Sequence, residues 1–312
     1  MPPTRLLLWT DSPAAYLDAI AAAGLADRVI AEPLSRKETP TQAQRADTDA
    51  MLAWGAPPGL LPHMPRLRWV QALTAGVETW LALPDLPEHL TLTCARGTHR
   101  ESMPENILAA LFHLTKPYAA AEQDQKLRKW VRRVATPLNG QTLGILGLGE
   151  IGQRVARLAD TIGMRVIGTK RRPEPLPHLA HVYPPDATDT VLAQSDFVLL
   201  LLPATPDTEN FINADRLARM KPTAYLLNFG RGHLIAAVQG KQIAGAVLDV
   251  FRQEPLPADH PFWATQGILV LPHIGGGHPT RDRTVARLFV ENLGSFLDGQ
   301  PLKQVVDRAA GY

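Results

Sequence analysis

The chain alternates short apolar runs with amphipathic stretches, and this alternation is strongest in its second half. Near-continuous apolar runs are typical of parallel strands that are covered on both faces. Helical stretches separate several of these runs, which predicts a doubly wound α/β sheet. The strands expected in this half are Leu143–Leu146, Arg165–Thr169, Phe197–Leu202, Ala224–Asn228, Ala246–Val250 and Ile268–Leu271.

The first third of the chain predicts a smaller α/β unit. A strand over Leu6–Trp9 leads into a helix over Pro13–Ala23. Gly24 ends this helix, because glycine suits the left-handed position that follows a helix. Further short strands are expected at Val29–Ala31, Met51–Trp54, Trp69–Ala72 and Leu90–Cys94.

Two helices outside these series indicate how the chain divides. Pro104–Tyr118 has a long helical pattern, with a proline near its first turn where a missing N–H is tolerated. Thr280–Leu297 is helical as well and leaves the strand series of the second half. We therefore expect two domains. Residues 1–98 and 280–312 form one domain, and residues 99–279 form the other.

The composition is that of a globular protein, since 45% of the 312 residues are hydrophobic. The net charge of +2 argues against a general nucleic-acid binder. The single cysteine, Cys94, excludes an internal disulfide and a multi-cysteine metal site, and the histidine spacing suggests no metal either. No apolar run is long enough for a signal peptide or a membrane span. We therefore expect a cytoplasmic protein.

A glycine-rich motif, G-x-G-x-x-G, follows the first strand of the second half. Gly147 permits a tight turn, Gly149 lets the backbone approach a pyrophosphate, and Gly152 lets helix and strand pack closely. Backbone N–H groups and the helix dipole would then hold the anion. An ordinary glycine turn is the alternative, but the strand, the helix and the second strand all fit a dinucleotide site.

A basic cluster stands where the choice between NAD and NADP is usually made. An NAD site places a carboxylate about 20 residues after the glycines to bind the ribose 2′-OH. Here that position is Lys170, followed by Arg171 and Arg172. Cationic side chains would pair with a 2′-phosphate, which predicts NADP(H) over NAD(H). The alternative is a solvated basic turn.

Four charged residues follow in apolar surroundings: Arg231, Asp249, Glu254 and His273. Arg231, Asp249 and His273 come at or just after the ends of predicted strands. Ligands of open α/β sheets bind at the carboxyl ends of the strands, so these side chains are candidates for one site. Each also has a structural alternative, as a salt bridge, a turn residue or a buried histidine, and the structural alternative is strongest for Asp249.

These motifs together resemble the D-isomer-specific 2-hydroxyacid dehydrogenase family. The similar segments occur in the order that the family shows: LGILGLGEIG, LLLLPATPDT, MKPTAYLLNFGRG, AGAVLDVFRQEPLP and LPHIGGG. The resemblance implies two doubly wound domains, a Rossmann dinucleotide-binding domain and a smaller flavodoxin-like substrate domain. After Ile235 the chain has fewer residues than the family pattern.

The resemblance also implies roles for individual residues. Arg231, Glu254 and His273 would be catalytic, because a guanidinium can hold a 2-oxoacid carboxylate and a histidine beside a carboxylate can supply a proton. Backbone groups of Ala75, Gly76 and Val77 would bind the substrate together with Arg231 and His273. The cofactor-binding set would be Gly147, Gly149, Glu150, Ile151, Gly152, Lys170, Arg171, Arg172, Leu202, Pro203, Thr205 and Asp249.

The predicted activity is NADPH-dependent reduction of a small 2-oxoacid, such as glyoxylate or hydroxypyruvate, to a D-2-hydroxyacid. Two alternatives stay open. One is a dehydrogenase of another small acid, such as phosphoglycerate, lactate or formate, and the other is a non-catalytic protein that senses dinucleotides. The segment Ala119–Asn139 occupies the place of the family's dimer arm, which predicts a homodimer with no nucleic-acid or membrane partner.

Overall fold

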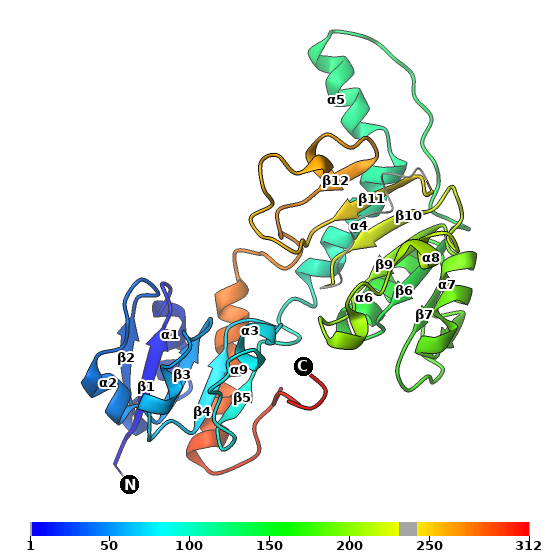
Figure 1. Cartoon of the computed structure of the whole chain (residues 1–312). Coiled ribbons are helices and arrows are strands. Elements are labelled where there is room, and N and C mark those ends of the chain that lie inside the picture. The colour runs from blue at the N-terminus through cyan, green and yellow to red at the C-terminus, as the bar shows by residue number, and fades with distance from the viewer. Residues whose placement is uncertain (1, 231–241, 312) are drawn as a thin grey trace. The chain divides into compact units, whose positions relative to one another are not determined.

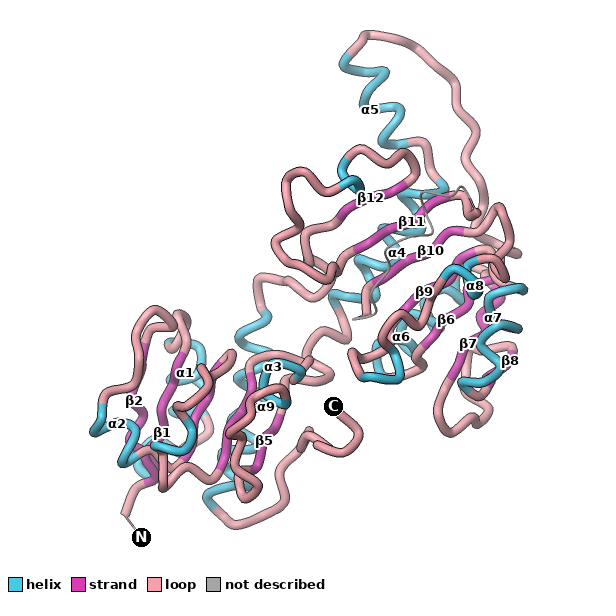
Figure 2. Tube along the Cα trace, in the orientation of Figure 1, coloured by secondary structure: helices cyan, strands magenta, loops and turns pink. Residues whose placement is uncertain are grey.

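The computed structural model describes residues 2–230 and 242–311. The chain divides into two compact units: one comprises residues 1–98 and 278–312, and the other comprises residues 99–277. Each unit is built around a parallel sheet with helices on its faces (Figures 1 and 2). No helix in the described part of the chain is long and apolar enough to cross a membrane.

The described residues of the first unit form a five-stranded sheet in the order β2-β1-β3-β4-β5. Neighbouring strands pair in parallel. This is the strand order of flavodoxin-like folds, so the expected fold class is confirmed for this unit. The strands are β1 (Thr4–Trp9), β2 (Val29–Leu34), β3 (Ala50–Ala53), β4 (Trp69–Ala72) and β5 (Thr91–Thr93), and the helices are α1 (Ala14–Ala22), α2 (Gln42–Asp47), α3 (Glu78–Leu81) and α9 (Arg281–Leu297).

Both faces of this sheet are buried, and successive side chains of a strand contribute to opposite faces. Leu6 and Leu8 of β1 pack with Tyr16 of α1 and Phe289 of α9. Leu7 of β1 belongs to the cluster on the other face. The final helix thus belongs to the core of the first unit, although most of the chain separates it from β5 in sequence.

The described residues of the second unit form a seven-stranded sheet in the order β12-β11-β10-β9-β6-β7-β8. All its neighbouring strands pair in parallel. The chain order reverses between β6 and β9, as in a Rossmann fold, so the Rossmann prediction is confirmed. The strands are β6 (Thr142–Leu146), β7 (Arg165–Thr169), β8 (His181–Tyr183), β9 (Phe197–Leu200), β10 (Tyr225–Asn228), β11 (Gly245–Leu248) and β12 (Ile268–Val270).

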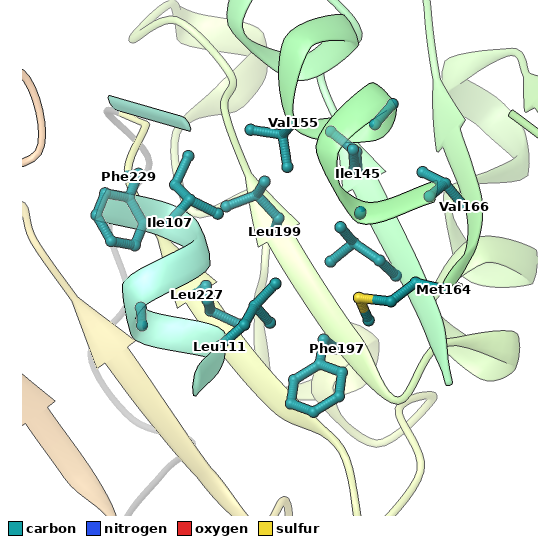
Figure 3. Packing of buried hydrophobic residues seen from close by; sticks show 14 of the residues in the cluster. Ile107, Leu111, Ile145, Val155, Met164, Val166, Phe197, Leu199, Leu227 and Phe229 are labelled. Atoms are coloured by element: carbon teal, nitrogen blue, oxygen red, sulfur yellow. The ribbon is translucent and has the colours of Figure 1, made fainter. Parts of the chain in front are cut away.

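Helices cover both faces of this second sheet. Ile107 and Leu111 of α4 meet Val155 of α6 over Leu199 and Leu227 of the strands (Figure 3). Residues of α7 belong to the cluster on the opposite face. Among the described residues, the helices of this unit are α4 (Ser102–Thr115), α5 (Tyr118–Lys126), α6 (Glu150–Thr161), α7 (Thr188–Gln194) and α8 (Ala214–Leu217). The 3₁₀ turns found in the described parts of both units are Ala26–Arg28, Leu61–His63, Pro185–Ala187, Pro206–Thr208 and Pro261–Trp263.

Several elements differ from the expectation, and among them the helices α2 and α3 were not predicted. The strand β8 was not predicted, because its three residues are too few and too polar to show an apolar run. The long helix expected over Pro104–Tyr118 ends at Thr115, and α5 begins separately at Tyr118. Pro117 explains the break, since the residue before a proline is disfavoured in helical conformation. Cys94 is fully buried, as expected for a small apolar side chain.

Candidate active site at the carboxyl edge of the second sheet

The glycine loop lies where the strand order of the second sheet reverses. Gly147 follows β6 with a φ of 108°, which a residue with a side chain rarely adopts. A Cβ there would lie 2.9 Å from the carbonyl oxygen of Leu201, which follows β9. A Cβ on Gly152 would lie 2.5 Å from the carbonyl oxygen of Gly147. Glycine is therefore required at both positions for the loops and the helix to approach this closely.

Gly149 shows a different use of glycine. It is the N-cap residue of α6, and no side chain caps the helix there. A Cβ at Gly149 would find no heavy atom within 4 Å, so open space lies in front of the helix end. The first turn also holds the exposed Glu150 and the half-buried Ile151. The free space and the positive helix end fit the pyrophosphate of a dinucleotide.

The basic cluster begins directly beside this loop. The N–H of Leu148, between the two glycines, donates to the carbonyl of Thr169 at 3.0 Å, and Lys170 comes next in the chain. The Lys170 ammonium forms an ion pair with Glu174. The hydrogen bond that Lys170 donates to Glu174, together with the charge of Lys170, lowers the pKa of the Glu174 carboxyl. Sequence reasoning missed Glu174, although an acidic residue four positions after a lysine is a readable signal.

The Arg171 and Arg172 side chains are exposed in the same loop. The loop after β9 carries the half-buried Leu202, Pro203 and Thr205. It is held by Thr208, whose hydroxyl donates to the Pro203 carbonyl at 2.6 Å, while the Thr205 N–H donates to that hydroxyl at 2.8 Å.

Two loops of the sheet edge also touch each other. A Cβ on Gly230, which follows β10, would lie 2.9 Å from Leu202 N and O. The loops after β6, β9 and β10 thus converge at one edge of the sheet. The glycine loop and Leu202 belong to this edge, so the structure brings together cofactor candidates that the sequence separates by more than fifty residues.

His273 and Glu254 form a close pair. The His273 Nδ1 atom lies 2.6 Å from Glu254 Oε2, and the other carboxylate oxygen accepts the backbone N–H of Phe251 at 2.8 Å. An ionised carboxylate only accepts hydrogen bonds, so Nδ1 must carry the proton between them. The side chains are 43% and 35% exposed, which leaves the imidazole accessible. The carboxylate thus fixes the imidazole tautomer and leaves Nε2 for a ligand.

Asp249 follows β11 and is buried, with 1% of its surface exposed. Its two carboxylate oxygens accept the backbone N–H groups of Ile274 and Gly275 at 2.8 and 2.9 Å. Burial raises the pKa of the Asp249 carboxyl, and these two hydrogen bonds oppose that rise. The structure therefore places Asp249 directly under the loop that carries His273.

The remaining candidates lie elsewhere. Arg231 and the residues just after Ile235, where the family pattern is expected to be longer, lie outside the described residues. Ala75, Gly76 and Val77 follow β4 in the first unit, where the Thr74 hydroxyl donates to the Gly76 carbonyl at 2.5 Å. Among the residues that the structure describes, no cluster of three or more histidine, cysteine or acidic side chains could hold a metal ion.

A parallel sheet with a glycine loop at its switch point, and a histidine–carboxylate pair at one edge, defines the class of NAD(P)-dependent oxidoreductases. The family model described as "D-isomer specific 2-hydroxyacid dehydrogenase, NAD binding domain" matches residues 108–275. The chain belongs to the D-isomer specific 2-hydroxyacid dehydrogenase family, as the motifs predicted, and is therefore an oxidoreductase.

Several relatives show how far the similarity extends. A glyoxylate/hydroxypyruvate reductase B of Pectobacterium carotovorum subsp. carotovorum is 33% identical over 261 residues, which cover 79% of this chain and 81% of that protein. A D-isomer specific 2-hydroxyacid dehydrogenase from Xanthobacter autotrophicus Py2, solved with NADPH and MES, is 28% identical and covers 99% of this chain and 100% of that chain, with a TM-score of 0.85. An NADPH-dependent glyoxylate/hydroxypyruvate reductase from Sinorhizobium meliloti, solved with NADP and sulfate, is 27% identical over 99% of this chain and 100% of that chain, with a TM-score of 0.83.

Proposed function

We propose that the protein reduces a small 2-oxoacid, glyoxylate or hydroxypyruvate first, to the D-2-hydroxyacid with NADPH as the reductant. The observation that carries this proposal is the His273–Glu254 pair, with 2.6 Å between Nδ1 and Oε2, beside a dinucleotide-binding sheet edge. A sensor of dinucleotides has no need of a histidine whose ring is held in place by a carboxylate. The names of the relatives from Pectobacterium and Sinorhizobium support the substrate class.

In this proposal the reaction needs a hydride on the keto carbon and a proton on the keto oxygen. The bound cofactor supplies the hydride. His273 donates the proton from Nε2, because Glu254 occupies Nδ1. Arg231 binds the substrate carboxylate and polarises the keto oxygen, and Asp249 lies on the nicotinamide side, as the family resemblance implies.

We assign the other predicted residues as follows. The substrate domain comprises residues 1–98 and 280–312, which fall within the first unit, and the backbone of Ala75, Gly76 and Val77 contacts the substrate carboxylate. The dinucleotide lies along the second sheet's edge. Its contacts are Gly147, Gly149, Glu150, Ile151, Gly152, Leu202, Pro203 and Thr205.

We further propose NADPH over NADH, through Lys170, Arg171 and Arg172. Charge-assisted hydrogen bonds from these cations favour a 2′-phosphate. Glu174 opposes this preference, because its carboxylate competes with the phosphate for Lys170. The Xanthobacter and Sinorhizobium proteins were solved with NADPH and NADP, which supports the assignment.

A steady-state screen tests both parts of the proposal. Oxidation of NADPH and of NADH is followed with glyoxylate, hydroxypyruvate, pyruvate and phosphohydroxypyruvate. We expect the highest kcat/KM for NADPH with glyoxylate or hydroxypyruvate. Absence of turnover with every 2-oxoacid would overturn the reductase function, and a higher kcat/KM with NADH would overturn the cofactor preference alone.

Two variants separate the charges within the basic loop. Lys170→Ala is expected to lower kcat/KM for NADPH about tenfold or more and to leave NADH nearly unchanged, because one charged hydrogen bond contributes about 1.5–3 kcal/mol. Glu174→Gln is expected to raise kcat/KM for NADPH, since it releases Lys170. Arg157→Ala, which removes an exposed cation from α6, is the matched control.

We also propose that two copies of the chain associate through the arm formed by α5 and the loop up to Asn139. The arm extends away from the second sheet (Figures 1 and 2). It exposes large apolar side chains. Trp130 is 95% and Val134 97% exposed. The base of the arm is closed, because Lys116 Nζ donates to the Thr136 carbonyl at 2.6 Å. A second copy would bury this surface.

Light scattering tests this association. We expect twice the chain mass of 34.1 kDa for the wild type and the single mass for a Trp130→Glu, Val134→Glu variant. A monomeric wild type would overturn the proposed dimer.

A further inference from the structure

The loop that carries His273 is held from two sides by side chains far away in the sequence. Asp249 accepts the N–H groups of Ile274 and Gly275, as described above. From the other side, the Asn106 amide of α4 donates to the Gly275 carbonyl at 2.9 Å and lies 3.4 Å from the Ile274 carbonyl. The two residues after His273 are therefore bound at their N–H groups by a carboxylate and at their carbonyl groups by an amide.

The chemistry of the two side chains matches these roles. A carboxylate only accepts, so it suits two N–H groups, and an amide nitrogen donates two protons, so it suits two carbonyls. The presence of two carbonyl acceptors also fixes which end of the Asn106 amide faces the loop. The Ser102 hydroxyl, one turn earlier on α4, lies 3.5 Å from the same Gly275 carbonyl.

The loop backbone needs such support. His273 has a φ of 54°, in the left-handed region that residues with side chains rarely occupy. Such conformations persist where the surrounding structure determines them. The turn that follows is closed by a hydrogen bond of 3.2 Å from the Gly277 N–H to the Ile274 carbonyl.

The fit against the supports is tight. A Cβ on Gly275 would lie 2.7 Å from Asp249 Oδ2 and 2.9 Å from the Phe229 ring. The Asp249 carboxylate can therefore approach this peptide closely only because residue 275 is a glycine. A shift of the loop away from Asp249 would break two hydrogen bonds, and a shift away from Asn106 would break the hydrogen bond to the Gly275 carbonyl.

We propose that Asn106 is a positioning residue for the reaction and, together with Asp249, fixes where His273 delivers its proton. This inference rests on the proposed function of His273. Asn106 contacts the loop backbone and does not touch the imidazole, so it acts through the loop. A displacement of a reacting group by about 1 Å can lower a rate a hundredfold, and loss of one support is expected to cause part of that loss.

Two variants of Asn106 test the proposal. In Asn106→Asp the shape is kept, but carboxylate oxygens face two carbonyl oxygens, and in Asn106→Ala the donor is simply removed. We expect kcat to fall about tenfold in Asn106→Asp and less in Asn106→Ala, with the KM for NADPH within twofold of the wild type. His113→Ala, on the exposed side of α4, is the matched control and should match the wild type.

A solvent isotope effect separates positioning from a general loss of structure. We expect the effect of D₂O on kcat to increase in both Asn106 variants, because proton delivery from His273 becomes the slower step. An unchanged solvent isotope effect with a normal kcat would overturn the positioning role.

Amide hydrogen exchange reports, without any turnover, on how firmly Asp249 and Asn106 hold the loop. In the two Asn106 variants we expect faster exchange than in the wild type for the peptide that contains Ile274 and Gly275, and unchanged exchange for the strands of the sheet. Unchanged exchange in that peptide would overturn the proposal that Asn106 holds the loop. A wild type that reduces no 2-oxoacid would overturn the proposed function, while these exchange rates would still decide whether Asn106 holds the loop.

Discussion

Each unit of the molecule buries a small polar network, and the two networks serve different ends. In the first unit Gln71, Thr93 and Asn292 are all completely buried. The Asn292 amide donates to Gln71 Oε1 at 3.1 Å, and the Thr93 hydroxyl donates to the same oxygen at 2.9 Å. This network is neutral and joins the final helix to the sheet.

The network of the second unit is charged and holds a loop. Asp249 is as deeply buried as the polar residues of the first unit, but its partners are two backbone N–H groups next to His273. Burial of an ionised group costs more than burial of an amide. Hydrogen bonds between distant segments thus maintain architecture in one unit, whereas in the other they place a reactive side chain at the end of a strand.

The largest effect is expected from removing the imidazole of His273, whose loop the second network holds. His273→Ala should lower kcat/KM by about 10²–10⁴, the range typical of general acid catalysis, and should leave both networks and the unfolding midpoint nearly unchanged. NADPH affinity, measured by fluorescence titration, should stay the same. A His273→Ala protein with more than a tenth of the wild-type kcat/KM would contradict the assignment of His273 as the proton donor.

The next effect should appear in stability alone. Asn292→Ala removes the bond to Gln71 and two bonds with the Lys303 backbone, at 3.0 and 2.7 Å. Buried partners are left unsatisfied, so the free energy of unfolding should fall by about 2–4 kcal/mol. Urea unfolding measures this loss, with the exposed Arg287→Ala on the same helix as control. A large loss of kcat in the folded variant would contradict the conclusion that the network of the first unit only maintains architecture.

The smallest effect is a pH dependence of stability. Burial raises the pKa of Asp249 above its ordinary value of 3.8, so the folded chain holds this proton to higher pH than the unfolded chain does. Stability therefore declines as pH rises through the window between 3.8 and the raised pKa.

The variant Asp249→Asn does not titrate and isolates this contribution. As pH rises through that window, the free energy of unfolding of the wild type should fall relative to that of the variant. At neutral pH the difference between the two should be constant. A difference that does not change with acid pH would show that the carboxyl ionises alike in both states.

The local patterns of the chain were enough to predict much of the fold. Apolar runs predicted most strands of both sheets, and the glycine spacing predicted the loop at Gly147, because both signals depend on near neighbours in sequence. The motif order also predicted the family. The short edge strand β8 was missed, since three residues of mixed polarity show no period.

The sequence by itself therefore determined the class of the sheets, the phosphate loop and the residue types of the candidate chemistry. Only the tertiary structure joined Asp249 and Asn106 to the backbone of the loop at Gly275. Asn106 and Gly275 are 169 positions apart, and no local periodicity encodes such a pairing. It arises when parallel strands bring their carboxyl ends to one edge and the helix packed on that sheet meets the loop there.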